Sequence, residues 1–296
     1  MAVSPDYDSP SALKAFLDER GMAMQKKFGQ NFMVNRAQRE RLIDALGIGK
    51  DSSVWEIGPG LGAMTDGILS RGAALTAFEI DRGFCAVLRD IFADRPGFTL
   101  IEGDVLKNWK KAIATSGVPS RLFGNLPYNI AAAIIGDLIS DGVRFDTVVI
   151  TVQKEVALRM AAKPGTEDYS SFSVLCQWAY TVTPLMDLAA GSFWPRPNVT
   201  SRAVKMTKRE AWPRCESPEI FMSLLRGLFS SRRKMIRNNF SAWLSTQGYA
   251  MSDGADESFA AGLLESSRID PKARAETLSV DDFLRLADTV TKAVRS

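Results

Sequence analysis

Two short segments of the chain combine residue types that could act on a nucleotide. The first, at 54–62, reads Val-Trp-Glu-Ile-Gly-Pro-Gly-Leu-Gly, and the second, at 122–128, reads Leu-Phe-Gly-Asn-Leu-Pro-Tyr. Glycines in the first let the backbone turn tightly and approach a ligand without a Cβ in the way. The second places an amide, a restrained carbonyl and an aromatic ring side by side, as the grip on an exocyclic amino group requires. Together the segments indicate methyl transfer to the amino nitrogen of a nucleobase.

Acidic residues near the glycine turn favour its interpretation as a site for a nucleoside cofactor. Glu79 lies 21 positions after Gly58, at the end of the next expected strand, where its carboxylate could accept hydrogen bonds from both ribose hydroxyls. Asp104 follows the strand after that and could accept from an adenine amino group, although a turn-capping role stays open. Glu56, just before the turn, suits a positively charged cofactor better than a diphosphate. A glycine turn without a ligand is the alternative.

The second segment could make an adenine amino group more reactive. This nitrogen is a poor nucleophile, because its lone pair is delocalised into the ring. Acceptors at the Asn125 side chain and the Leu126 carbonyl would favour a pyramidal nitrogen and restore its lone pair. Pro127 stiffens the turn, and Tyr128 offers a face for a base taken out of its stack. The alternative is a strand-ending turn whose aromatic ring is merely packed.

The composition excludes several other chemistries. The chain has 296 residues, a formal net charge of +3 and no histidine, which excludes Ser-His-Asp and Cys-His catalysis and imidazole metal sites. Its three cysteines are scattered and form no CxxC pair, as in a protein of the reducing cytosol. No signal peptide or apolar run of transmembrane length is present. We therefore expect a cytoplasmic protein without a membrane partner and without a catalytic metal.

Apolar runs alternate with helical patterns over most of the chain, which predicts a mostly parallel α/β sheet with helices on both faces. We expect residues 1–25 to form an N-terminal helical extension, 26–207 the sheet domain and 208–296 a small all-helical domain. A closing hairpin is expected to pair 174–182 with 203–206. The expected strands cover 54–57, 74–80, 98–102, 121–124 and 147–153; the expected helices cover 10–21, 36–46, 84–92, 130–139, 155–162, 218–229, 235–244, 259–264 and 280–294.

A basic cluster stands in the C-terminal part. It lies within twelve residues that contain no acidic side chain, and it could neutralise several phosphates of a nucleic acid. A solvated helix face is the alternative. The cluster comprises Arg226, Arg232, Arg233, Lys234 and Arg237, of which Arg233 and Arg237 would share a face if a helix ran through the stretch.

Five motifs in order resemble the rRNA adenine N(6)-methyltransferase family, in its small-subunit adenine dimethyltransferase branch (KsgA/Dim1). The likeness runs from about Lys26 to Met206 and continues more weakly through the C-terminal helices. The motifs are Lys27-Phe28-Gly29-Gln30-Asn31-Phe32-Met33, Glu56-Ile57-Gly58-Pro59-Gly60-Leu61-Gly62, Asn125-Leu126-Pro127-Tyr128-Asn129-Ile130, Val152-Gln153-Lys154-Glu155-Val156-Ala157 and Phe193-Trp194-Pro195-Arg196-Pro197-Asn198-Val199.

The resemblance implies a Rossmann-like class I methyltransferase sheet and S-adenosyl-L-methionine as methyl donor. It further implies dimethylation of two adjacent adenosines in the 3′-terminal hairpin of 16S rRNA, within an immature 30S subunit, by a monomeric enzyme. The large-subunit adenine methyltransferases of macrolide resistance and a non-catalytic assembly or transcription factor on the same fold are the alternatives. Gln153-Lys154-Glu155, Leu126 and the helical tail favour the small-subunit enzyme, and the intact motifs favour activity.

The resemblance also assigns residues to roles. Met33 stands where leucine is usual, a conservative change. The implied cofactor residues are Asn31, Met33, Gly58, Gly60, Glu79, Ile80, Asp104, Val105 and Asn125; the implied catalytic residues are Asn125, Leu126, Pro127 and Tyr128; the acceptor base and RNA would meet Phe193, Pro195, Pro197, Arg226, Arg233, Lys234 and Arg237.

Overall fold

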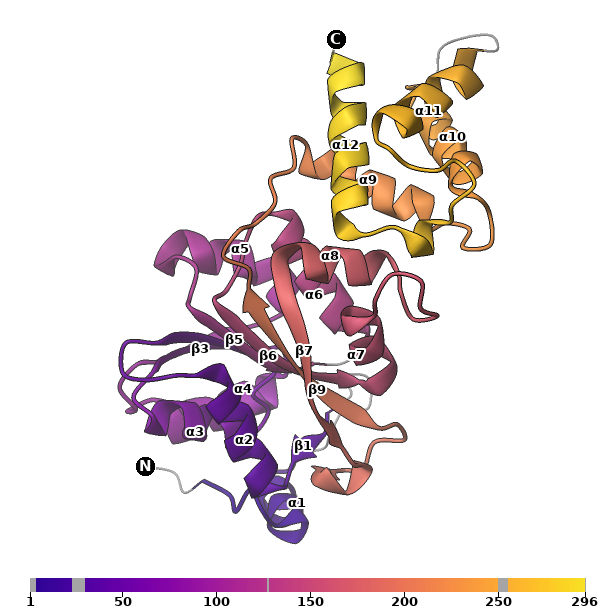
Figure 1. Ribbon diagram of the computed structural model, residues 1–296. Coiled ribbons are helices and arrows are strands. Elements are labelled where there is room, and N and C mark those ends of the chain that lie inside the picture. The colour runs from indigo at the N-terminus through magenta and orange to yellow at the C-terminus, as the bar shows by residue number, and fades with distance from the viewer. Residues whose placement is uncertain (1–3, 23–29, 127, 250–254, 296) are drawn as a thin grey trace. The chain divides into compact units, whose positions relative to one another are not determined.

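The computed structural model describes residues 4–22, 30–126, 128–249 and 255–295. It divides into two compact units (Figure 1). The first comprises Met1–Ile135, Val143–Ala157 and Thr181–Lys208, and the second comprises Gly136–Gly142, Leu158–Tyr180 and Arg209–Ser296. The first unit thus includes the N-terminal residues that were predicted as a separate extension. The second unit contains two segments from the predicted sheet domain in addition to the C-terminal residues. The functional domain boundaries stay a prediction.

A seven-stranded sheet of order β4-β3-β2-β5-β6-β9-β7 organises the first unit. β2 to β6 run parallel, β9 pairs antiparallel with β6, and the predicted α/β class is confirmed. The strand order reverses at β2 and β5, so a ligand is expected beyond the carboxyl ends of these two strands. The strands are β2 (Ser53–Ile57), β3 (Ala74–Glu79), β4 (Phe98–Glu102), β5 (Arg121–Asn125), β6 (Thr147–Gln153), β7 (Tyr180–Leu188) and β9 (Ser201–Lys208).

Helices and one small second sheet complete this unit. Ser9 accepts a hydrogen bond from the backbone N–H of Ala12 (3.2 Å) and Pro10 takes the first helical position, so α1 begins where its sequence predicts. The helices are α1 (Pro10–Glu19), α2 (Arg36–Leu46), α3 (Ala63–Ser70), α4 (Arg82–Phe92) and α5 (Val105–Ser116), with the first parts of α6 (Tyr128–Ser140) and α7 (Lys154–Ala161), whose last residues belong to the second unit. The second sheet pairs β1 (Phe32–Met33) with β8 (Phe193–Trp194), after a 3₁₀ turn at Ala190–Ser192.

Apolar side chains of α1 to α4 form one core with the strands. Leu13 and Leu17 of α1 belong to it together with Leu42 of α2, Ile68 of α3 and Phe92 of α4, each less than 4% exposed. α1 is therefore an integral part of this unit's core.

The second unit is helical, and aromatic side chains fill its core. The rings of Trp178 and Phe221 lie 4.8 Å apart, and those of Phe229 and Phe283 lie 5.6 Å apart. Tyr169 is fully buried and donates its hydroxyl hydrogen bond to the carbonyl of Leu278 (2.9 Å). The helices are α8 (Ser171–Ala179), α9 (Pro218–Leu228), α10 (Ile236–Thr246), α11 (Ala255–Ser266) and α12 (Val280–Arg295), with a 3₁₀ turn at Ala275–Thr277.

The predicted hairpin is wrong in its first strand. Residues 171–179 form helix α8, and β7 begins only at Tyr180 beside β9. Ser170 and Ser173 form a capping box that starts the helix. The following residues are buried on most sides, and a short apolar run of this kind has no period that distinguishes strand from helix.

The helices of the described residues include none whose length and hydrophobicity would allow it to span a membrane.

Candidate active site

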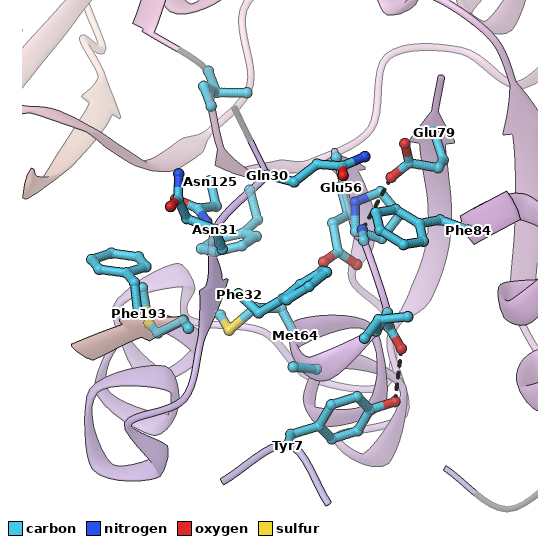
Figure 2. Close-up of a pocket in the computed structure, with 18 of the residues that line it drawn as sticks. Tyr7, Gln30, Asn31, Phe32, Glu56, Met64, Glu79, Phe84, Asn125 and Phe193 are labelled. Carbon is cyan, nitrogen blue, oxygen red and sulfur yellow. Dashed lines mark hydrogen bonds between the residues drawn. The ribbon is translucent and has the colours of Figure 1, made fainter. Parts of the chain in front are cut away.

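A cavity of about 410 Å³ lies at the carboxyl ends of β2 and β5 (Figure 2). Residues from both ends of the first unit's sequence surround it, although nearly two hundred positions separate them. The lining residues come from the N-terminal segment (Tyr7, Leu13, Gln30, Asn31, Phe32, Met33), the first glycine motif (Glu56, Gly58, Pro59, Gly60, Leu61, Ala63, Met64), the end of β3 and the start of α4 (Glu79, Ile80, Phe84), the second motif (Phe123, Asn125, Leu126) and the segment from β8 to β9 (Phe193, Pro197, Ser201).

The glycine turn has the conformation that its residues predict. Gly58, Gly60 and Gly62 have φ angles of 72°, 59° and 91°, which L side chains rarely adopt. A Cβ on Gly62 would lie 2.4 Å from the ring of Phe92, whereas one on Gly58 would find its nearest neighbour, the carbonyl of Asn125, at 4.0 Å. Gly62 therefore serves packing, and Gly58 leaves the backbone open toward the cavity.

Two buried carboxyl groups face this cavity. Oε2 of Glu79 accepts a hydrogen bond from the N–H of Gly60 (3.0 Å), and Oε1 accepts one from the N–H of Asp81 (2.9 Å). Glu56 is 1% exposed and accepts from the hydroxyl of Thr65 (2.7 Å). Burial raises the pKa of Glu79 to about 7 and that of Glu56 to about 8. Such a pair favours a cationic ligand, whose charge would offset the cost of ionising the carboxyl groups.

The second motif ends β5 and carries the amide that faces the cavity. The Asn125 Nδ2 atom donates to the carbonyl of Asn31 (2.9 Å), and Figure 2 shows the two asparagines side by side. Leu126 is 2% exposed, and a Cβ on Gly124 would lie 2.6 Å from its side chain, so glycine is needed at 124 for this close approach. Pro127 lies outside the described residues, and Tyr128 is the first residue of α6.

A lid segment, residues 30–33, covers the cavity next to Asn125. Its strand β1 pairs Phe32 with Trp194 and Met33 with Phe193, and the N–H of Val34 donates to the carbonyl of Ser192 (2.9 Å). The Phe32 ring stacks on Trp194, with centroids 6.2 Å apart. The structure thus pairs the expected cofactor residue Met33 with the expected acceptor residue Phe193, and Asn31 lines the same cavity.

Residues 7–13 form a part of the cavity wall that sequence reasoning missed. The Tyr7 hydroxyl donates to the carbonyl of Leu61 (2.9 Å) inside the glycine motif, and Leu13 of α1 also lines the cavity. Arg39 of α2 is 7% exposed; it donates to the carbonyl of Met33 (2.7 Å) and forms an ion pair with Asp8. The one available signal was the apolar spacing of α1, which does not reveal where the helix packs.

Several expected site residues lie outside this lining. Asp104 caps α5, because its Oδ1 accepts from the N–H of Leu106 (3.0 Å), and neither Asp104 nor the buried Val105 lines the described cavity. Pro195 follows β8 without lining it, whereas Ile80 lines it and is 44% exposed. Among the described residues, no group of three or more acidic or cysteine side chains could hold a metal ion.

The basic cluster belongs to the second unit and does not form one helix face. α9 ends at Leu228 and α10 begins at Ile236, so no helix runs through the stretch and the condition for a common face of Arg233 and Arg237 is not met; Arg233 lies in the connecting turn. Arg232 is already engaged in that turn, through Glu276 (3.1 Å) and the carbonyl of Glu167. Arg226 lies in the last turn of α9, and Arg233, Lys234 and Arg237 are exposed.

Comparisons with known proteins agree with this geometry. The chain is 46% identical over 288 residues to the ribosomal RNA small subunit methyltransferase A of Treponema denticola, covering 97% of this chain and 96% of the relative. A dimethyladenosine transferase from Plasmodium falciparum superimposes with a TM-score of 0.73 at 25% identity, over 87% of this chain and 96% of that structure. The 23S rRNA methyltransferase ErmE superimposes with a TM-score of 0.60 at 19% identity, over 87% and 98%, which shows a shared fold alone.

The sequence profile described as "Ribosomal RNA adenine dimethylase" matches residues 21–292, nearly the whole chain. This match confirms the resemblance that the five motifs carry, and the mostly parallel sheet with its glycine turn agrees with it. The chain is therefore a methyltransferase that belongs to the ribosomal RNA adenine dimethylase family.

Proposed function

We propose that this protein dimethylates the exocyclic amino nitrogen of two adjacent adenosines in the 3′-terminal hairpin of 16S rRNA, with S-adenosyl-L-methionine as donor. The proposal includes an immature 30S subunit as substrate particle and a monomeric enzyme in the cytoplasm. The observation that carries it is the position of Asn125, which ends β5, lines the cavity and holds the lid segment through Asn31. The similarity to the ribosomal RNA small subunit methyltransferase A of Treponema denticola supports the choice of small-subunit RNA.

The residues of the cavity fit this cofactor. Gly58 leaves room for close approach, and Glu79 could accept hydrogen bonds from both ribose hydroxyls while its pairing with Gly60 keeps it oriented. Glu56 would lie near the cationic part of the ligand, because it is the second carboxyl group of the lining. When bound, the cofactor supplies an electrophilic methyl group. Asp104 lies outside the described lining and caps α5 through Oδ1, so an adenine contact, as the family resemblance implies, would use its other carboxylate oxygen.

The chain's own contribution to the reaction is to orient the acceptor nitrogen. Oδ1 of Asn125 and the carbonyl of Leu126 would accept its two hydrogens, which favours a pyramidal nitrogen whose lone pair faces the methyl group. Phe193 and Pro197, which line the cavity, and Tyr128 would enclose the base. The exposed Arg226, Arg233, Lys234 and Arg237 would neutralise phosphates of the same RNA.

The test is to incubate the protein with unmodified small ribosomal subunits and with large-subunit RNA, then map methylated adenosines by mass spectrometry. We expect two adjacent dimethyladenosines in the small-subunit RNA, and near loss of both in Asn125→Ala with the fold intact. Methylation of large-subunit RNA would instead support the alternative of the macrolide-resistance type. No methylation of either RNA would support a non-catalytic factor.

A further inference from the structure

A buried threonine stands next to the catalytic amide. Thr151 lies on β6 directly opposite Asn125 of β5 in the parallel pairing, and it is 1% exposed. Its hydroxyl donates a hydrogen bond to Oδ1 of Asn125, and its carbonyl accepts one from the N–H of Leu126 (3.2 Å). One residue of β6 therefore contacts both members of the acceptor grip.

The hydrogen-bond network leaves one orientation for the Asn125 amide. The carbonyl of Asn31 can only accept, so the atom that faces it must be Nδ2. Oδ1 then faces Thr151, whose hydroxyl can donate or accept and here must donate. Oδ1 keeps a second lone pair, which is the acceptor that the amino group of a base would need.

The surroundings of Thr151 do not otherwise call for a hydroxyl. Its neighbour across the antiparallel pairing is Ala203, and Val149 lies two positions earlier on the same face of β6. Ala203, Val149 and Phe123 belong to the apolar core on this face. A valine would have the same branched shape there, and a buried hydroxyl is costly unless it is hydrogen-bonded.

We propose that Thr151 is a positioning residue, which holds Oδ1 of Asn125 in the orientation that accepts the amino group of the target base. The proposal rests on the proposed function of Asn125, although the orientation of the amide can be measured independently of methylation. Without the hydroxyl, the Asn125 amide is held by its bond to Asn31 alone. It then rotates about its Cβ–Cγ bond more often, so fewer molecules hold Oδ1 in the orientation that accepts the amino group.

Three variants separate this role from packing. Thr151→Val removes the hydroxyl and keeps the shape, whereas Thr151→Ser keeps the hydroxyl and removes a methyl group. Thr147→Val is the matched control, because Thr147 is also buried, on the same strand and face, but at its other end. Steady-state kinetics with unmodified small ribosomal subunits give kcat and KM. NMR relaxation of the Asn125 side-chain amide gives its order parameter; the amide signal is assigned because it is missing in Asn125→Asp.

We expect kcat of Thr151→Val to fall about tenfold, the effect of one lost hydrogen bond on the transition state. The KM for the cofactor should stay within about twofold, because the lost hydrogen bond orients Oδ1 of Asn125 toward the amino group of the target base and not toward the cofactor. Thr151→Ser should recover most of kcat, and Thr147→Val should equal the wild type. The amide should become more mobile in Thr151→Val alone.

Equal loss of kcat in Thr151→Ser and Thr151→Val would overturn the proposal in favour of packing, as would an equally ordered Asn125 amide in all variants. An inactive wild type whose amide still loosens in Thr151→Val would reject the proposed methyl transfer and keep the positioning role. The two conclusions can therefore fail separately.

Discussion

Glu56→Gln is expected to make the stability of the protein less dependent on pH. Glu56 is the last residue but one of β2, is 1% exposed and accepts a hydrogen bond from the hydroxyl of Thr65. Glutamine keeps the shape and can accept the same hydrogen bond, but it never ionises. The comparison between the two proteins therefore isolates the cost of one buried charge.

The size of the expected change in the free energy of unfolding follows from the pKa of Glu56. Burial raises the pKa of Glu56 from 4.5 to about 8, so between these values the folded protein keeps a proton that the unfolded chain releases. The free energy of unfolding then falls as pH rises, by up to about 1.4 kcal/mol per pH unit. The contribution is fully present below pH 4.5 and is lost by about pH 8, in all about 5 kcal/mol. Burial also raises the pKa of Glu79. Glu79 is present in both the wild type and Glu56→Gln, so its contribution to the pH dependence cancels in the comparison.

Urea unfolding of both proteins at intervals from pH 5 to pH 9, without cofactor, measures this difference. We expect Glu56→Gln to gain stability relative to the wild type as pH rises, with the gain levelling off near pH 8. Parallel curves for the two proteins would refute the reasoning, because they would mean that Glu56 ionises in the folded protein as it does in water.

Three further perturbations test other parts of the structure. Glu79→Ala should weaken S-adenosylmethionine binding by roughly 1.5–3 kcal/mol, the range for hydrogen bonds to a charged group, and unchanged affinity in calorimetry would remove Glu79 from the cofactor site. Gly124→Ala should lower the free energy of unfolding by about 1–3 kcal/mol in urea titrations, because the new Cβ meets the buried Leu126 side chain, and wild-type stability would show that Leu126 can move aside. Joint replacement of Arg233, Lys234 and Arg237 by glutamine should reduce the salt slope of RNA binding by up to about 0.7–0.9 per lost phosphate contact, and an unchanged slope would leave these side chains as a solvated surface.

Local chemistry made much of this protein predictable. Ser9-Pro10 starts a helix because a side-chain cap and a fixed φ act within a few residues, and the apolar runs of β2 to β6 alternate with helices in a parallel α/β order. Gly58 and Glu79 could be assigned to a cofactor turn because strand ends of a parallel sheet meet at one edge. These features depend on neighbours in sequence or on one general rule of sheet assembly.

Other features depend on contacts between distant segments, which no local pattern encodes. The strand predicted from residue 174 was wrong because the apolar side chains of α8 are buried on most sides, so their spacing had no period that distinguishes strand from helix. Leu13 lines the cavity because α1 packs into the core of the sheet unit, and the lid segment meets Phe193 because β1 pairs with β8. Thr151 reaches Asn125 only through the register of β5 and β6. Residue types and spacing indicated the chemistry, but long-range packing and strand register decided which side chains surround it.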